Sequence, residues 1–508
     1  MIRRAAVVLA VGAAMLAAGC GGGGGSSDEL ASVVPANAPI YVESVIRPEG
    51  EQRDAIDSLA SRVGGIDDPG AAIVQQLNAA LAGSGTDATY ENDIAPWLGE
   101  RAAVFSESFE SDTPIAVVFQ TTDAGGAQDF LDKATSSSGG VKEATYNGVS
   151  YFVAEDSEGV TTAVGLVDDF LVVGTLEGFK AAVDASKGDS LADASAFEDS
   201  ASALPDDNLA LGYADGTRAG EALVSQATDP LQATVIRSAL QTLANGPVTF
   251  ALTATPDTAT LDVSLPTGVA AKLDGGDLVG HAPANVWFAV GLADVGGILG
   301  GALDTADALQ LSSIEGRIKQ LTGVDPNDVA SWMQDGYGFV AGTSEKTISI
   351  GGVVKSSNTD ESANAIEAFH KRFSQDADAK LGPPPQGADE GFSASAPESP
   401  QAIQVGQFGD QVVAALGPGQ PGEEALHPEH PLAGDPEFQD GEDALGSDFS
   451  PLAFVSLPPF FVVAEKGGSA SDPDYVAAKP YLEKLDYLMV GASGDGDRST
   501  ARFVVGVK

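Results

Sequence analysis

The sequence NDIAPWL at residues 92–98 returns as NDVASWM at residues 327–333, and this repeat decides the expected fold. In both places a short apolar stretch follows, at residues 102–105 and 337–340. Further segments recur in the same order: PAN at 35–37 and 283–285, VGLVD at 164–168 and VGQFG at 405–409, and an LA pair with a later phenylalanine at 191–197 and 432–438. No single match is long, but the preserved order predicts two copies of one domain.

The length of the chain agrees with two domains. A sequence of 508 residues is longer than the roughly 250–300 residues at which a single hydrophobic core stops growing. Each copy closes with two strand-like runs, at 248–254 with 260–265 and at 487–492 with 501–507. We therefore predict two tandem, related domains at residues 33–272 and 281–508.

Turn signals indicate how the strands of a copy pair. Asn147-Gly148 separates two strand-like runs and is the strongest short signal for a type I′ hairpin. Asp168-Asp169 and Pro256-Asp257 predict two further turns between apolar runs. Hairpins join antiparallel strands. We therefore predict an α+β fold in which each domain is a mainly antiparallel sheet with helices packed on it.

Helical periodicity predicts the helices that pack on the sheet. It marks residues 127–134, with Phe130 and Leu131 facing inward, and residues 232–245. Trp97 and Trp332 occupy matching places in the two copies, and we expect them to anchor equivalent corners of the core; a binding role is the alternative. Residues 286–303 are apolar, but their glycines favour a strand followed by a helix or turn over a membrane span.

The first 19 residues read as a signal peptide. Arg3 and Arg4 precede an apolar run at residues 5–18, which is shorter than the roughly 20 residues that a membrane-spanning helix needs. The run ends in LAAGC at residues 16–20, which resembles the lipobox of bacterial lipoproteins, although its leucine lies four places before the cysteine rather than three. The resemblance implies cleavage before Cys20 and attachment of a diacylglyceryl lipid to its thiol.

The residues around Cys20 place the protein at a membrane. Cys20 is the one cysteine of the chain, so no internal disulfide is expected, and we predict it as the lipidation site. The stretch GGGGGSSD at residues 21–28 is typical of a flexible tether, which we assign to residues 20–32. The expected location is the extracytoplasmic face of the cell membrane, with the membrane bound through the N-terminal lipid.

The charge of the chain restricts its partners. The net charge is −47, which opposes binding to nucleic acid and to anionic lipid headgroups. A solvated surface of a secreted protein explains this charge; a role in binding cations or basic partners is the alternative.

Several segments together resemble one bacterial family. They are VPANAPIYVE at residues 34–43, WLG at 97–99, YNG at 146–148, and SLA at 190–192 with Phe197. The family consists of secreted or membrane-anchored proteins of high-GC Gram-positive bacteria and is known only as a domain of unknown function. The resemblance covers most of the mature chain and implies no activity.

Three short motifs are similar to catalytic or metal-binding sequences. GDSL at residues 188–191 spells an esterase nucleophile block, but its context favours a helix N-cap at Ser190 or Asp193. HPEH at residues 427–430 has ligand-like spacing, yet its prolines indicate a loop. DGD at 495–497 is explained by a turn between the last two strands. We predict no catalytic, cofactor-binding or metal-binding residue.

These observations favour a non-enzymatic lipoprotein with a binding or envelope-interaction role. A small-molecule or lipid ligand in a cleft between the two domains is one possibility, and contact with other envelope proteins is another. An envelope hydrolase acting on glycans or esters is the alternative class, because a pair of catalytic carboxylates leaves no recognisable motif among 73 acidic residues.

Overall fold

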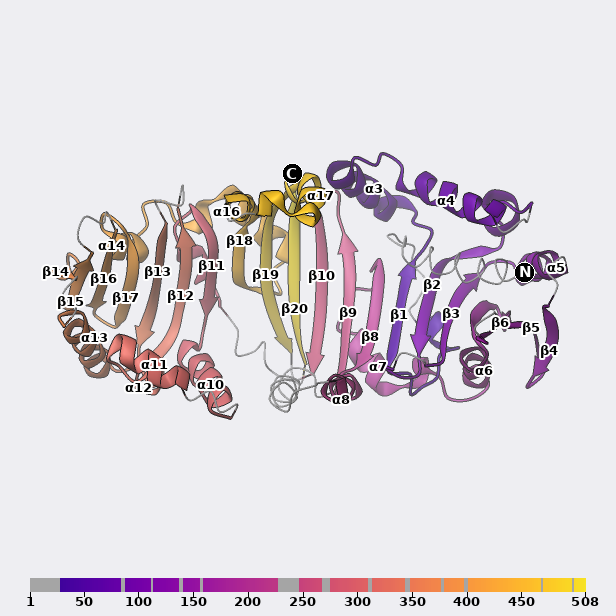
Figure 1. The fold of residues 1–508 in the computed structure, drawn as a ribbon, viewed down its shortest axis with the longest axis horizontal. Helices are drawn as coiled ribbons and strands as arrows, with labels where there is room; N and C mark the ends of the chain where they lie inside the picture. Colours follow the sequence, from indigo (N-terminus) through magenta and orange to yellow (C-terminus); the bar gives the residue numbers. More distant parts are fainter. Residues whose placement is uncertain are drawn as a thin grey trace. The chain divides into compact units, whose positions relative to one another are not determined.

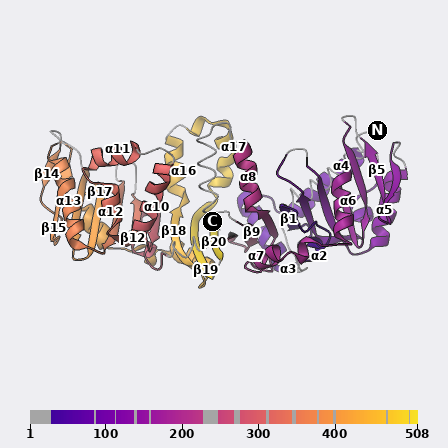
Figure 2. The same cartoon turned by 90° about the horizontal axis from the view of Figure 1, so that it is seen from below.

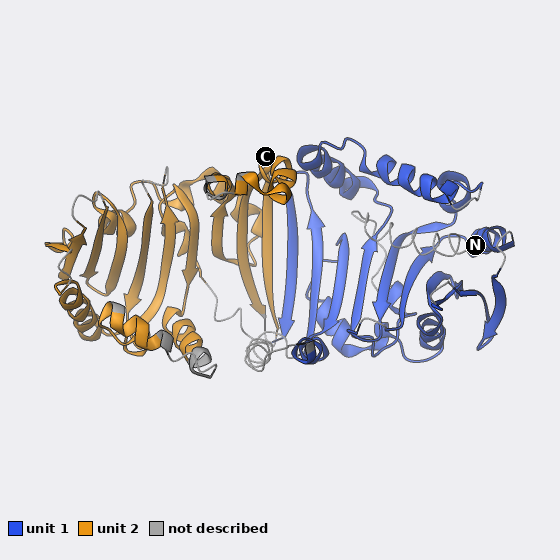
Figure 3. Cartoon of the chain, in the orientation of Figure 1, with its two compact units in different colours: residues 1–228, 239–266 blue, residues 229–238, 267–508 orange. Residues whose placement is uncertain are grey.

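The computed structural model describes residues 28–508 (Figure 1), apart from 84–86, 111–112, 137–139, 156–158, 227–245, 267–274, 309–312, 343–347, 376–378, 397–400, 467–468 and 496–497. The strand pairings described between neighbouring strands are antiparallel, and helices lie between the strands in sequence, so the predicted α+β fold is confirmed. The chain divides into two compact units (Figure 3), and the described residues up to Pro266 form unit 1.

Unit 1 is built around a sheet in which β4-β5-β6-β7-β3-β2-β1-β8-β9-β10 are neighbours in that order. The strands are β1 (Ile40–Val45), β2 (Leu98–Ser106), β3 (Ile115–Thr121), β4 (Lys142–Tyr146), β5 (Val149–Glu155), β6 (Thr161–Val167), β7 (Phe170–Thr175), β8 (Ala210–Asp215), β9 (Pro247–Ala254) and β10 (Thr258–Pro266).

Unit 2 repeats this order with strands numbered ten higher, β14-β15-β16-β17-β13-β12-β11-β18-β19-β20. They are β11 (Val286–Leu292), β12 (Met333–Ala341), β13 (Ser349–Ser356), β14 (Lys380–Gly382), β15 (Glu390–Ser395), β16 (Gln401–Phe408), β17 (Gln411–Pro418), β18 (Ser450–Ser456), β19 (Leu485–Asp495) and β20 (Arg498–Val507). The two units therefore share one strand order, while the boundaries 33–272 and 281–508 stay a prediction.

Helices cover both faces of the unit 1 sheet (Figure 2). Successive strand residues point to opposite faces, and Val172 and Val173 accordingly belong to different core clusters. The first cluster includes side chains from α2 (Asp28–Ala31), α6 (Leu176–Ala185) and α7 (Ser195–Ala201), and the second from α4 (Pro69–Gly83) and α5 (Ala124–Ser136). The remaining helices are α3 (Gly50–Leu59), α8 (Gly216–Gln226) and the π-helical turns Ala60–Gly64 and Tyr90–Ile94.

Unit 2 has a core on each face of its sheet in the same way. One cluster holds Phe438 and Phe454, and the other holds Trp332 and Phe392. The helices are α10 (Val295–Ala308), α11 (Ser313–Thr322), α12 (Pro326–Ala330), α13 (Thr359–Phe373), α14 (Pro421–Leu426), α15 (Pro436–Leu445), α16 (Leu457–Lys466) and α17 (Pro473–Leu482). In the part of the chain that the structure describes, no helix combines the length and the apolar character needed to cross a membrane.

The local predictions of turns and helices are confirmed where the structure describes them. Asn147 and Gly148 connect β4 to β5 with φ of 47° and 84°, as a type I′ turn requires. Asp168 has a φ of 51° between β6 and β7, and residues 256–257 lie between β9 and β10. Helix α5 buries Leu131 and packs Phe130 on the same cluster. The predicted helix at 232–245 lies outside the described residues.

Two predictions about larger features can also be compared with the structure. Trp97 and Trp332 are each 4% exposed and belong to core clusters of unit 1 and unit 2, so both are core anchors as predicted. Residues 286–303 form β11 and most of α10, which confirms the strand followed by a helix.

One boundary of the predicted tether requires a correction. Residues 28–32 were assigned to the tether, but α2 begins at Asp28, and Leu30 and Ala31 are buried in the core of unit 1. The four-residue helix is too short for a periodic apolar pattern, so the sequence offered little sign of it. The core of unit 1 therefore includes residues that the prediction had placed in the tether.

Candidate functional site

The residues of the GDSL motif form a cap, as the alternative explanation predicts. Ser190 precedes a 3-10 turn at Leu191–Asp193. Its hydroxyl and its backbone amide both donate to Oδ2 of Asp193, at 2.6 and 3.1 Å. These hydrogen bonds lower the pKa of the Asp193 carboxyl. The partner of the Ser190 hydroxyl is thus a carboxylate that orders a turn, and no imidazole takes that place.

The other two motifs lie at the ends of secondary-structure elements. His427 follows α14, and its amide donates to the Glu423 carbonyl at 2.8 Å; the His430 carbonyl accepts from the Ala284 amide at 2.8 Å. Asp495 ends β19 and pairs with Arg498 of β20, and residues 496–497, where the turn is predicted, lie outside the described residues. No group of three or more potential metal-ligating side chains occurs among the residues described. Cys20 lies outside them.

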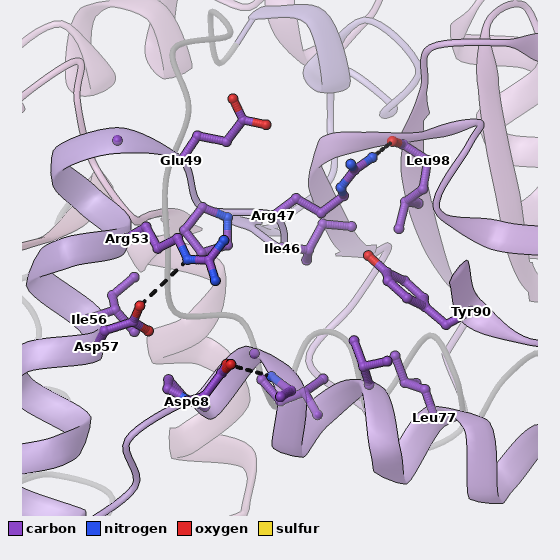
Figure 4. A pocket seen from close by; sticks show the side chains of 17 residues that line it. Ile46, Arg47, Glu49, Arg53, Ile56, Asp57, Asp68, Leu77, Tyr90 and Leu98 are labelled. Carbon is purple, nitrogen blue, oxygen red and sulfur yellow. Dashed lines mark hydrogen bonds and ion pairs between the residues drawn. The ribbon is translucent and has the colours of Figure 1, made fainter. Parts of the chain in front are cut away.

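Sequence reasoning did not identify the main pocket of unit 1, which lies between α3 and α4 (Figure 4). Its volume is about 530 Å³. Apolar side chains line much of it, from the segment after β1, from both helices and from the start of β2: Ile46, Ile56, Ile73, Val74, Leu77 and Leu98. Every lining residue belongs to unit 1. A ligand in a cleft between the two domains was one possibility from the sequence and stays a prediction; the pocket described here lies within unit 1.

The local sequence explains why two helices enclose this space. Gly65, with a φ of 64°, follows the π-helical turn that extends α3. Helix α4 then begins with Pro69, a favoured first residue of a helix. The Asp68 carboxylate accepts a hydrogen bond from the Ala71 amide at 2.8 Å and so caps the start of α4. Ile73 and Leu77 are four positions apart and therefore share the helix face that meets the pocket.

Two hydrogen bonds fix the side chain of Arg47, a cation at the pocket. Its Nη1 donates to the carbonyl of Ala95 at 3.0 Å and to the carbonyl of Leu98 (Figure 4). These two bonds orient the guanidinium, whose Nη2 and Nε donors bond no protein group among the described residues. No described carboxylate forms an ion pair with Arg47.

The acidic side chains at the pocket have other partners or surroundings. Asp57 pairs with Arg53 one helical turn earlier, with 3.5 Å between Oδ2 and Nε. Asp68 caps α4, and Glu49 is exposed with its carboxylate directed away from Tyr90 and Leu77 (Figure 4). These carboxylates therefore leave the charge of Arg47 without a direct counterion.

Tyr90 contributes the remaining polar group of the pocket. Its hydroxyl points toward the space between Ile46 and Leu77 (Figure 4) and has no hydrogen-bond partner among the described residues. Burial raises the pKa of Tyr90, while the nearby Arg47 guanidinium acts in the opposite direction. The hydroxyl is thus protonated at neutral pH and can donate one hydrogen bond into the pocket.

A buried ion pair lies in the sheet near the pocket. Nη2 of Arg101 is 3.0 Å from Oε1 of Glu43 and 2.8 Å from Oδ1 of Asn208, and the Tyr41 hydroxyl donates to Oε2 of Glu43 at 2.5 Å. The side chains of Glu43 and Arg101 are 0% and 4% exposed. Neither residue of this pair was predicted from the sequence. The available signal was the single charged residue of β1, Glu43, and the adjacent charges Glu100 and Arg101 of β2.

A second hollow of about 570 Å³ in unit 1 has a different character. Four carboxylates line it, from Glu107, Glu177, Asp184 and Asp189, together with Lys180. Asp184 accepts hydrogen bonds from the Tyr146 hydroxyl at 2.9 Å and the Asn147 side-chain amide at 2.7 Å, so it fastens α6 to the β4–β5 turn. The charged groups of this hollow are mostly acidic and Asp184 is engaged in structural hydrogen bonds, whereas the pocket between α3 and α4 contains arginines and a cluster of aliphatic side chains.

The fold and the pocket define an α+β protein with antiparallel strand pairing and a partly apolar pocket in its first unit. A family model described as "Protein of unknown function (DUF3352)" matches residues 3–448, and the chain belongs to this family. The predicted resemblance to a family of unknown function is confirmed to that extent.

Among solved structures, crystal forms I, IV and III of TP0453 are similar, with identities of 13, 14 and 16% and a TM-score of 0.26 each. These matches cover 48, 47 and 48% of this chain and 80, 80 and 81% of the TP0453 chains. No curated protein matches the sequence.

Proposed function

We propose that this protein is a lipid-anchored binding protein on the extracytoplasmic face of the cell membrane, and that it holds a small amphipathic molecule between α3 and α4 without transforming it. The pocket carries the proposal. Its volume of about 530 Å³ lies in the range of roughly 300–1,000 Å³ that ligand sites occupy. Its lining combines aliphatic side chains with five charged ones and the Tyr90 hydroxyl, so it offers an amphipathic molecule both apolar and polar contacts.

The residues at the pocket support binding over catalysis. Among the described residues, its lining contains no serine, cysteine or histidine, the side chains that most often act as nucleophile or base. Asp57 is paired with Arg53 and Asp68 caps α4, so neither carboxylate is presented as a general acid or base. A carrier is favoured over a scaffold because an envelope scaffold does not require an internal apolar cavity.

The N-terminal sequence supports the anchor. The basic start, the short apolar run and Cys20 form the lipoprotein signal described above. From Cys20 to the first residue of α2, Asp28, eight peptide units can span at most roughly 26 Å at about 3.3 Å per residue. An anchored unit 1 would thus stay close to the membrane that supplies amphipathic molecules.

Native mass spectrometry tests the binding function. Residues 28–508, purified from the native host without denaturation, are expected to show a reproducible extra mass that denaturation removes. The Ile73→Trp variant is expected to lose this mass, because the larger side chain fills the space beside α4. Ala79→Trp is the matched control, since Ala79 is exposed on the same helix and does not line the pocket. A clean apo mass for the unaltered protein would contradict the proposal.

A further inference from the structure

The Arg47 guanidinium is held in place by protein groups that leave its charge available. Both hydrogen bonds on Nη1 go to neutral backbone carbonyls, of Ala95 and Leu98. The Nη2 and Nε donors carry no bond to a described residue, and a guanidinium edge of this kind matches the two oxygens of a carboxylate or phosphate.

Tyr90 adds a donor on the same side of the pocket. Its hydroxyl has no described protein partner and points toward the cavity (Figure 4). Tyr90 is also close enough for the Arg47 charge to act on its ionisation. Together the two side chains offer a fixed cation and a neutral donor, which is a recognition pair for an oxyanion.

The apolar part of the pocket sets the size of the rest of the ligand. Ile56 of α3 and Ile73 and Leu77 of α4 form its apolar sides. The pocket volume of about 530 Å³ lies within the range of roughly 300–1,000 Å³ that small-molecule sites occupy. One hydrocarbon chain between the two helices is a ligand of this class, and a lipid with two such chains is much larger.

We infer that the ligand is an anionic amphiphile with a single hydrocarbon chain, whose acid group is bound by Arg47 and Tyr90 and whose chain lies between α3 and α4. This inference rests on the proposed binding function and specifies the ligand class. A free fatty acid and a lysophospholipid share this chemistry, because each has one chain and one anionic group.

Calorimetric titration of residues 28–508 with four 16-carbon probes tests the inference. The probes are palmitate, palmitoyl-lysophosphatidylglycerol, hexadecanol and hexadecyltrimethylammonium, all below their aggregation concentrations. Palmitate or the lysolipid is expected to bind at least about tenfold more tightly than the alcohol or the cation, since charge-assisted hydrogen bonds are the strong ones. Tighter binding of palmitate identifies a free acid as the ligand, and tighter binding of the lysolipid identifies a phosphate headgroup.

Variants connect the preference to the two residues. Arg47→Gln is expected to weaken binding of the preferred anion about tenfold or more and to leave hexadecanol unchanged. Tyr90→Phe, which breaks no described protein hydrogen bond, is expected to weaken it about threefold to tenfold, and Arg47→Lys is expected to retain part of the preference. Arg62→Gln is the control: it removes the same charge from the turn that follows α3, outside the pocket.

The outcomes separate the inference from the function on which it rests. The anionic ligand is overturned if hexadecanol or the cation binds as tightly as both anions. It is also overturned if Arg47→Gln and Tyr90→Phe leave the affinity for the anion unchanged. In either case the pocket remains a binding site. Failure of all four probes to bind, together with a clean native mass, overturns both.

Discussion

At the scale of single residues, the buried Glu43–Arg101 pair is the least expected feature of unit 1. Two charges in a sheet interior lose their hydration, which their mutual attraction only partly restores. Here Asn208 and Tyr41 supply additional hydrogen bonds to the pair. Unit 2 has Gly336 four residues after Trp332, where unit 1 has Arg101 four residues after Trp97, so the shared strand order does not require the pair. It is a specific property of the unit that contains the pocket.

Removing one partner of this pair is expected to destabilise the folded protein strongly. Arg101→Met leaves the Glu43 carboxylate buried without its cation and should lower the free energy of unfolding by about 3–5 kcal/mol. The double variant with Glu43→Leu should recover much of that loss, because it removes both charges. Urea denaturation followed by circular dichroism measures the difference. Arg62→Met, which breaks an exposed pair with Asp257, should cost less than about 1 kcal/mol. Equal losses for Arg62→Met and Arg101→Met would contradict this account.

At the scale of elements, the features that could be predicted from the sequence are those that a few neighbouring residues determine. A type I′ hairpin is encoded by two adjacent residues, and Asn147-Gly148 forms the turn that its residue types favour. The internal repeat likewise identified the Trp97 and Trp332 corners. The pocket could not be found in this way, because packing brings together residues such as Arg47 and Leu98 that are 51 positions apart in the sequence. Isolated charges such as Glu43 show no partner until the register of β1 and β2 is known.

The β4–β5 turn provides a test at this scale. A Cβ on Gly148 would meet only the Nζ of Lys187, at 3.9 Å, so Gly148→Ala meets little steric resistance. The φ of 84° is nevertheless unfavourable for alanine and should destabilise the protein by about 1–2 kcal/mol. Gly316→Ala in α11 also places its Cβ in open space. Because alanine favours the helix more than glycine does, this substitution should stabilise the protein by up to about 1 kcal/mol. Opposite shifts of the urea midpoint are expected, and shifts of the same sign would disagree with a conformational cause.

At the scale of the whole molecule, two units with one strand order do not carry the same groups. The segment between β1 and β2 forms α3 and α4, which enclose the pocket, while the corresponding segment between β11 and β12 forms α10, α11 and α12. The strand order therefore supplies a common framework, and the inserted helices distinguish the units. Arg47 and Tyr90 both lie in this inserted region of unit 1 or beside it, so the binding function is assigned to unit 1.

The proposed attachment to the membrane can be tested because the chain is strongly acidic. A net charge of −47 repels anionic lipid headgroups, so we propose that the predicted lipid on Cys20 supplies the attraction. Two acyl chains on one residue are sufficient for stable anchoring. Cys20→Ser should therefore move the protein from the membrane fraction of the native host to the soluble fraction or the medium, which immunoblotting of fractionated cells measures. Ser26→Ala, a substitution in the same tether, should leave it on the membrane. Retention of the Cys20→Ser chain in the membrane fraction would show that some other part of the protein binds the membrane against this repulsion.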